Sequence, residues 1–312
     1  MRILVVGAGA TGGYFGTRLA QAGRDVTFLV RPRRAVTLRE RGLRIIGLGE
    51  EEVITPQLVT ADELSSPYDL VLLSVKATTL EQAIEDAAPA IGPKTAIVPF
   101  LNGMAHLDQL NARFGARPVL GGVAKILTTV NDDGDIVRLA PLATLTIGEQ
   151  DGRPSPRVDA VHALLDDAGI DASVSTDIVA AMWHKWVFIT TVGALTCLMR
   201  GTVGDVGAVP GGSGLGPAIL AEAAAVSAAA GFPVPEAELA TTTSIVTRSG
   251  SPFASSMYRD VMSGRPTEVE HVFGDFVTRA SALSVATPLL DLATLNLRVH
   301  EHRTEQAALE RA

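Results

Sequence analysis

The N-terminal stretch Met1-Arg-Ile-Leu-Val-Val-Gly-Ala-Gly-Ala-Thr-Gly-Gly13 decides the fold of this chain. A short apolar run, residues 3–6, leads into the pattern Gly7-x-Gly9-x-x-Gly12, and a helical pattern follows at once. This order predicts the opening of a βαβ unit that binds a dinucleotide. The first glycine permits the tight turn, the second lets the backbone approach a pyrophosphate, and the third lets the helix pack close to the strand. A plain glycine-rich turn is the alternative.

The expected cofactor is NADP(H). Ala10 and Thr11 lie within the glycine motif and are expected to bind the cofactor with it, ahead of the helical pattern of residues 14–22, whose N-terminal N–H groups would face the phosphates. Arg31 follows the predicted second strand, residues 25–30, where an NAD site usually carries Asp or Glu. A guanidinium offers a planar fork of donors to a 2′-phosphate, whereas a carboxylate would repel it. The neighbouring Arg33 and Arg34 are better explained as solvated surface charge than as cofactor ligands. The predicted cofactor-binding residues of this segment are Gly7, Gly9, Ala10, Thr11, Gly12 and Arg31.

Length and composition fit a two-domain enzyme. The chain has 312 residues, more than one typical domain, and its 47% apolar and 19% charged residues are neither disordered nor fibrous in type. A net charge of −8 argues against a nucleic-acid partner. One cysteine, Cys197, excludes an internal disulfide, and without a signal-peptide pattern we expect a cytoplasmic protein. We expect no membrane partner, because no run reaches about 18 uninterrupted apolar residues, and no metal site, because no His/Cys spacing suits one.

Alternating strand and helix patterns over residues 1–174 predict a Rossmann-type α/β domain with a parallel sheet. Residues 70–75 indicate a strand buried on both faces, residues 95–100 indicate the next strand, and further strands are expected at 119–124 and 144–147. Lys76 and Asn102 follow the strands of residues 70–75 and 95–100, at the carboxyl edge where such sheets bind ligands. We expect both residues near the cofactor. A surface lysine and an ordinary Asn-Gly turn are the alternatives.

Helical patterns over residues 175–312 predict a second, all-α domain. Residues 179–199 are apolar almost all round, which predicts a buried helix. Lys185 lies on this helix between Trp183 and Trp186. An ammonium on an apolar face loses solvation and its pKa should fall, which suits a general acid. A lysine whose stem snorkels to the surface is the alternative. The face that Lys185 shares consists of Ile178, Met182, Ile189 and Val192.

Three further polar residues are candidates for the site. Ser256 and Asp260 are four residues apart and so lie on one helix face. Glu268 is expected as the first residue of a helix that begins with a capping box, Thr267-x-x-Glu270. The helix macrodipole alone would favour an acidic residue there, and Asp260 could pair with Arg259 or Arg265 instead.

Taken together, these motifs resemble the ketopantoate reductases (2-dehydropantoate 2-reductases) over essentially the whole chain. The resemblance implies an NADPH-dependent oxidoreductase that reduces a 2-keto acid to a 2-hydroxy acid. The expected reaction is ketopantoate to pantoate, in pantothenate and coenzyme A biosynthesis. Besides the glycine turn and Arg31, the matching segments are Val75-Lys76-Ala77, Asn102-Gly103-Met104, Trp183-His184-Lys185-Trp186, Ser255-Ser256-Met257-Tyr258-Arg259-Asp260 and Thr267-Glu268-Val269.

The resemblance also implies roles for individual residues. Lys185 is the implied general acid, and Glu268 supports both it and the substrate. Lys76 and Asn102 are implied to lie around the nicotinamide and the substrate. The implied partner is a small-molecule 2-keto acid, and a homodimer is one candidate assembly. The implied substrate-binding residues are Lys76, Asn102, Ser256, Asp260 and Glu268.

The chain departs from the family at two positions. Family members often carry asparagines four and eight residues after the catalytic lysine, where they hydrogen-bond the substrate, and here these positions are Ile189 and Gly193. The exchange removes polar contacts and alters the volume of the pocket. A reductase of a more apolar 2-keto acid, or of another carbonyl or imine, is therefore an alternative function. A non-catalytic NADP(H)-binding sensor is an alternative of another class.

Overall fold

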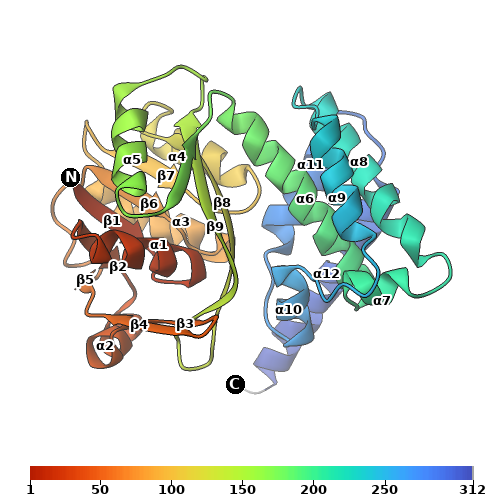
Figure 1. The fold of residues 1–312 in the computed structure, drawn as a ribbon, viewed down its shortest axis with the longest axis horizontal. Helices are drawn as coiled ribbons and strands as arrows, with labels where there is room; N and C mark the ends of the chain where they lie inside the picture. The colour runs from red at the N-terminus through yellow and green to blue at the C-terminus, as the bar shows by residue number, and fades with distance from the viewer. Residues whose placement is uncertain (311–312) are drawn as a thin grey trace. The chain divides into compact units, whose positions relative to one another are not determined.

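The computed structural model describes residues 1–310, and the chain divides into two compact units (Figure 1). The first unit comprises Met1–Leu101 and His106–Ala181, and the second comprises Asn102–Ala105 and the chain from Met182 onward. The first is an α/β unit and the second is helical, which confirms the predicted fold class. A boundary of functional domains after residue 174 stays a prediction.

A five-stranded parallel sheet is the framework of the first unit. Its central strand, β1, is apolar on both faces, and Ile3, Leu4 and Val5 are all 0% exposed. The sheet order turns back at β1, which lies between β2 and β6, and ligands of open parallel sheets bind at such a switch point. In spatial order the strands are β5 (Gln57–Val59), β2 (Asp25–Leu29), β1 (Arg2–Val6), β6 (Leu70–Leu73) and β7 (Ala96–Pro99).

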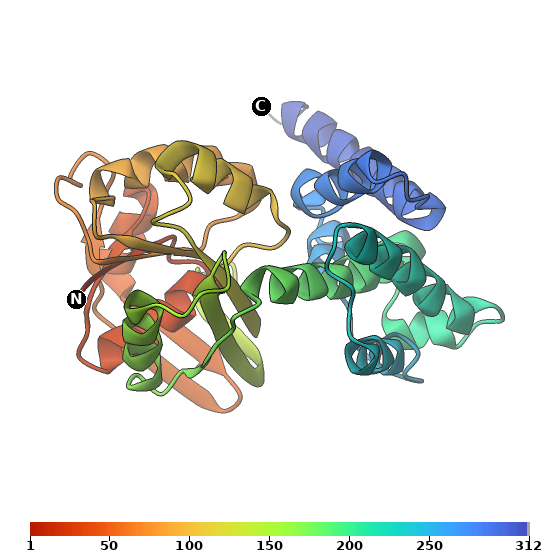
Figure 2. The same ribbon diagram turned by 90° about the horizontal axis from the view of Figure 1, so that it is seen from above.

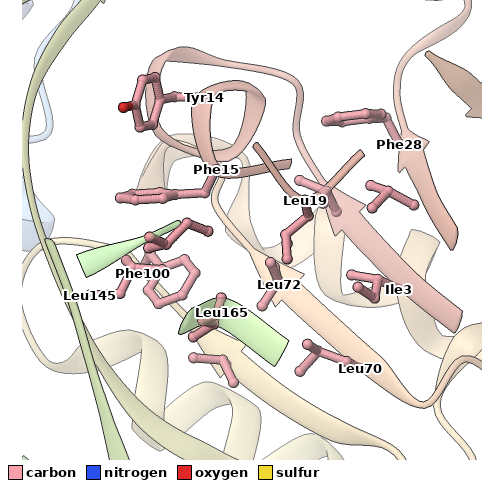
Figure 3. Packing of buried hydrophobic residues seen from close by; sticks show 14 of the residues in the cluster. Ile3, Tyr14, Phe15, Leu19, Phe28, Leu70, Leu72, Phe100, Leu145 and Leu165 are labelled. Atoms are coloured by element: carbon pink, nitrogen blue, oxygen red, sulfur yellow. The ribbon is translucent and has the colours of Figure 1, made fainter. Parts of the chain in front are cut away.

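Helices cover both faces of this sheet. Figure 2 shows α1 (Ala10–Gln21) and α5 (Pro156–Asp166) on one face and α3 (Leu80–Ala87) and α4 (Ala105–Phe114) on the other. The first face buries one apolar cluster, in which Phe15 and Leu19 of α1 pack with Leu165 of α5 (Figure 3). The remaining helical segments of this region are α2 (Pro32–Arg41) and the short 3-10 turns η1 (Ala77–Thr79) and η2 (Ala88–Ala90).

A second, mixed sheet completes the first unit. The sequence predicts only short strands at 119–124 and 144–147, but the structure has a long antiparallel pair, β8 (Leu120–Val130) and β9 (Ile136–Glu149). The strands are longer because cross-strand pairing continues from Leu120 opposite Glu149 to Val130 opposite Ile136, with one irregularity on the way. β9 also pairs in parallel with β10 (Asp171–Val174) and with β3 (Leu43–Gly47), which pairs with β4 (Glu50–Ile54).

Every regular element in the described part of the second unit, residues 182–310, is a helix. Its longest apolar helix, α6 (Ile178–Met199), is the one described helix with the length and composition of a membrane span, with a mean hydropathy of 1.4. Because 67% of that window is buried inside the structure, α6 has the character of a core helix. The others are α7 (Val203–Gly207), η3 (Gly212–Gly214), α8 (Leu215–Ala229), α9 (Glu236–Val246), α10 (Ser256–Met262), the π-helical turn η4 (Glu270–Gly274), α11 (Asp275–Ala282) and α12 (Pro288–Leu309).

Candidate active site

The glycine turn at the end of β1 has the geometry that its sequence predicts. Gly7 has a φ of +97°, and a Cβ built there would lie 2.8 Å from the Ser74 carbonyl oxygen. A Cβ on Gly12 would overlap the Gly7 carbonyl oxygen and lie 2.9 Å from the Ser74 Cβ. A Cβ on Gly9, by contrast, would have no atom within 4 Å. Two glycines are therefore needed for packing, and the third leaves open space beside the backbone.

The first turn of α1 begins in that open space. Gly9 is the N-cap residue, and Ala10 and Thr11 are the first two helical residues, both half-buried. The first N–H groups of a helix have no acceptor within the helix, so they can donate to an anion at the N-terminus. The residues present therefore fit a dinucleotide pyrophosphate: donors at the helix start, and a glycine whose missing side chain leaves room.

Arg31 lies beyond the end of the neighbouring strand. Val6 of β1 pairs with Leu29 of β2, and the Gly7 amide donates to the Leu29 carbonyl at 3.1 Å. Both strands therefore end at the same edge of the sheet. Arg31 is the N-cap residue of α2, and its side chain is exposed. Arg34 is engaged elsewhere, because its Nη2 donates to the Gly134 carbonyl oxygen at 2.7 Å.

Lys76 follows β6 at this same edge. β6 pairs in parallel with β1, and the Ser74 amide donates to the Val6 carbonyl at 3.0 Å. Lys76 is exposed, and its carbonyl oxygen accepts hydrogen bonds from the Thr79 amide at 3.0 Å and the Thr79 hydroxyl at 3.1 Å. The turn that carries Lys76 is thus held in one conformation beside the glycine turn.

In the second unit, aromatic packing fixes the rotation of α6 around Lys185. Trp183 stacks on Phe232 with ring centroids 5.8 Å apart, and Trp186 meets Phe276 edge-on at 4.7 Å. Lys185 is half-buried, and its neighbour His184 turns toward α9, with Nδ1 3.5 Å from Glu238 Oε1. Of the predicted face of Lys185, Ile178, Met182 and Val192 are buried and Ile189 is half-buried. The apolar setting is as expected, and a lowered pKa of Lys185 stays a prediction.

The predicted capping box before Glu268 does not form. The amide and hydroxyl of Thr267 both donate to Glu301 Oε1 at 2.7 Å, and Glu270 accepts from Arg298 twice at 2.7 Å. Charged partners on α12 therefore replace the local capping bonds. Helical structure begins one residue after Glu268, so the prediction that Glu268 is the first helical residue is wrong. The segment continues as the π-helical turn η4, a conformation that occurs often at functional sites.

Two predicted site residues of the second unit, Asn102 and Glu268, meet at His271, a residue that sequence reasoning missed. The backbone of Asn102 hydrogen-bonds to His271, and the Glu268 carboxylate acts electrostatically on the imidazole. A Cβ on Gly103, whose φ is +78°, would lie 2.8 Å from the His271 carbonyl oxygen. Burial lowers the pKa of His271, against the opposing effects of Glu268, Asp275 and the Asn102 bond. The one sequence signal that could have indicated the contact between Gly103 and His271 is the Asn102-Gly103 turn.

The remaining candidates lie on α10. The Ser255 hydroxyl caps this helix by accepting from the Tyr258 amide at 3.0 Å. Ser256 is the first helical residue and is exposed. Asp260 Oδ1 lies 3.2 Å from Arg265 Nη2, so the ion pair considered as an alternative is present. A role for Ser256 or Asp260 in substrate binding stays a prediction.

This fold and this glycine turn are those of the two-domain, Rossmann-type oxidoreductases. The model of the family "Ketopantoate reductase PanE/ApbA" matches residues 3–152, and the model of its C-terminal domain matches residues 177–301. The chain belongs to this ketopantoate reductase family, and it is an oxidoreductase.

Individual relatives match over nearly their full length. The uncharacterized oxidoreductase YkpB of Bacillus subtilis (strain 168) is 34% identical, over 96% of this chain and 99% of that protein. The crystal structure of 2-dehydropantoate 2-reductase from Geobacter metallireducens GS-15 has a TM-score of 0.87 at 26% identity, covering 96% and 99% of the two chains. A ternary structure of D-mandelate dehydrogenase with NADH and anilino(oxo)acetate has a TM-score of 0.88 at 22% identity, covering 98% and 100%, and shares the fold.

Proposed function

We propose that this protein is an NADPH-dependent reductase of a 2-keto acid, with ketopantoate as the first substrate to test. The observation that carries the proposal is the glycine turn, which is closed at Gly7 and Gly12 but open at Gly9, beside a second strand that leads into Arg31. A dinucleotide needs that opening. Arg31 supports NADP(H), because no carboxylate stands where NAD enzymes usually hold the ribose hydroxyls.

The residues of the chain supply binding and a proton. The bound reduced nicotinamide would supply a hydride to the carbonyl carbon of the substrate. Negative charge then builds on the carbonyl oxygen, and the Lys185 ammonium stabilises and protonates that oxygen. The product is a hydroxyl group, and Lys185 becomes a neutral amine that takes up a proton from water. Glu268 is the proposed support of Lys185 and of the substrate, with Lys76 and Asn102 near the nicotinamide and Ser256 and Asp260 at the substrate.

The physiological assignments follow the same proposal. Reduction of ketopantoate would place the enzyme in pantothenate biosynthesis. A cytoplasmic location is supported by Cys197, a buried free thiol, because reducing compartments keep thiols free. A homodimer remains the proposed assembly.

Steady-state oxidation of NADPH and NADH, with ketopantoate and a panel of other 2-keto acids, tests the function. We expect turnover with at least one 2-keto acid and a higher kcat/KM with NADPH than with NADH. Absence of turnover with every member of the panel would remove the proposal. The panel also tests the second candidate, a more apolar 2-keto acid, which the side chains beyond Lys185 on α6 favour.

A further inference from the structure

The face of α6 that continues from Lys185 offers hydrocarbon only. Residues three, four, seven and eight positions along a helix lie on nearly the same side as the first. From Lys185 these positions are Phe188, Ile189, Val192 and Gly193, and none of them has a polar side-chain atom. A substrate whose carbonyl oxygen reaches Lys185 and whose body extends along this face therefore finds no donor or acceptor among these four side chains of α6.

A side chain at position 193 would be crowded by Phe273. A Cβ built on Gly193 would lie 3.0 Å from Cζ and 3.3 Å from Cε2 of Phe273. Phe273 is 0% exposed, and Gly193 is buried. The ring therefore occupies the volume that a side chain at position 193 would need, and an asparagine there requires the ring to move.

The backbone that carries Phe273 is held on both sides. The Trp186 indole donates to the carbonyl of Val272, the preceding residue, at 2.9 Å. On the other side, a Cβ on Gly274 would overlap the Glu270 carboxylate, which Arg298 holds. These contacts join η4 to α6 and to α12, so displacement of the ring would disturb the buried Trp186–Val272 hydrogen bond and the packing around it.

We propose that Phe273 is a specificity-determining residue, which hinders a polar side chain at position 193 and, with Ile189, makes the enzyme prefer 2-keto acids with hydrocarbon side chains over hydroxylated ones. The inference rests on the proposed function and names its substrate class. A hydroxyl on the substrate loses its bonds to water at this face and gains none from these side chains.

The test compares two substrates that differ in one group. Trimethylpyruvate is ketopantoate without its hydroxyl. With NADPH, we expect the wild-type kcat/KM to be about 10- to 100-fold higher for trimethylpyruvate, the range expected when a hydroxyl enters an apolar pocket. A higher kcat/KM for ketopantoate, or equal values, would overturn the specificity inference and leave the reductase proposal intact. Failure of both substrates and of the whole keto acid panel would instead count against the proposed function.

The steric part is tested without activity, by thermal unfolding. We expect Gly193→Asn to lower Tm clearly in the wild-type background and to lower it less in a Phe273→Ala background, as a double-mutant cycle measures; Phe273→Ala alone also lowers Tm, because the ring is fully buried. Gly207→Asn is the matched control, because a Cβ on Gly207 would have no atom within 4 Å. A Tm for Gly193→Asn equal to that of the control would overturn the role of Phe273.

In the triple variant Ile189→Asn, Gly193→Asn, Phe273→Ala, the substrate preference should move toward ketopantoate by about tenfold or more. An unchanged preference in a folded triple variant would also overturn the role of Phe273.

Discussion

Gly12 lies directly against the Gly7 carbonyl oxygen, so the first turn of α1 packs on the turn that leaves β1. Gly9, between them, has open space where its side chain would be. The same added methyl group should therefore affect different properties at the two positions: stability at Gly12 and cofactor binding at Gly9.

Gly12→Ala should lower the free energy of unfolding by about 1–3 kcal/mol or more, because the added methyl overlaps backbone. Gly9→Ala should change it by only about 0.5 kcal/mol, yet weaken NADPH binding by about tenfold or more, because its methyl enters the space for the pyrophosphate. Urea unfolding and a fluorescence titration with NADPH measure the two effects. Unaltered NADPH affinity in Gly9→Ala would contradict the predicted cofactor position.

Lys185→Ala should reduce kcat by about 100- to 10,000-fold, the usual contribution of a general acid. The dissociation constant of NADPH should stay close to the wild-type value, because the glycine turn and Arg31 belong to the other unit. Single-turnover kinetics and a binding titration separate the two. Lys94→Ala, at an exposed loop lysine, is the control and should keep full activity. Full kcat in Lys185→Ala would refute the assigned role.

Arg31→Ala should weaken NADPH binding by about 10- to 100-fold, the cost of losing charge-assisted hydrogen bonds to a phosphate, and should leave NADH binding nearly unaltered. Arg33→Ala removes an equally exposed charge two residues further on and serves as the control. The dissociation constants of NADPH and of NADH, measured for each variant, test this prediction. An equal loss for NADPH and NADH would rule out contact with the 2′-phosphate.

His271 should make stability depend on pH. Burial lowers the pKa of this imidazole in the folded protein below its ordinary value of 6.5, so the unfolded chain binds the proton more readily. The folded protein loses no stability from His271 well above pH 6.5. The loss in free energy of unfolding grows as the pH falls through 6.5 toward the lower pKa of the folded state. Histidine titrates between about pH 5 and pH 8. Urea unfolding across this range should therefore show that the free energy of unfolding falls more steeply for the wild type than for His271→Phe. His302→Gln, at an exposed histidine, should follow the wild type. Parallel curves for wild type and His271→Phe would contradict the prediction.

Cys197 should be unreactive in the native protein. Burial raises the pKa of its thiol to about 11, so almost no thiolate exists near neutral pH. Ellman's reagent should label one thiol per chain in denaturant and react far more slowly without it. Fast labelling of the native protein at neutral pH would mean that α6 opens readily around this residue.

The sequence alone determined the elements that depend on local chemistry. The run from β1 through the glycine turn into α1 is specified by residue type, because only glycine tolerates the φ of Gly7 and the close packing at Gly12. Arg31, Lys76 and Lys185 were found from their position after apolar strands or on an apolar helix. The same reasoning predicted the buried character of α6.

The tertiary structure decided whatever depends on partners distant in the chain. The Thr267-x-x-Glu270 pattern looked like a local cap, but Glu301 and Arg298 of α12 supply stronger, charged partners. The contact of Gly103 with His271 joins segments more than 160 residues apart in sequence, and the position of Phe273 over Gly193 joins two different helical segments. Local patterns fix conformation because backbone sterics act between neighbours. Charge pairing and volume exclusion act between residues that only the folded chain brings together.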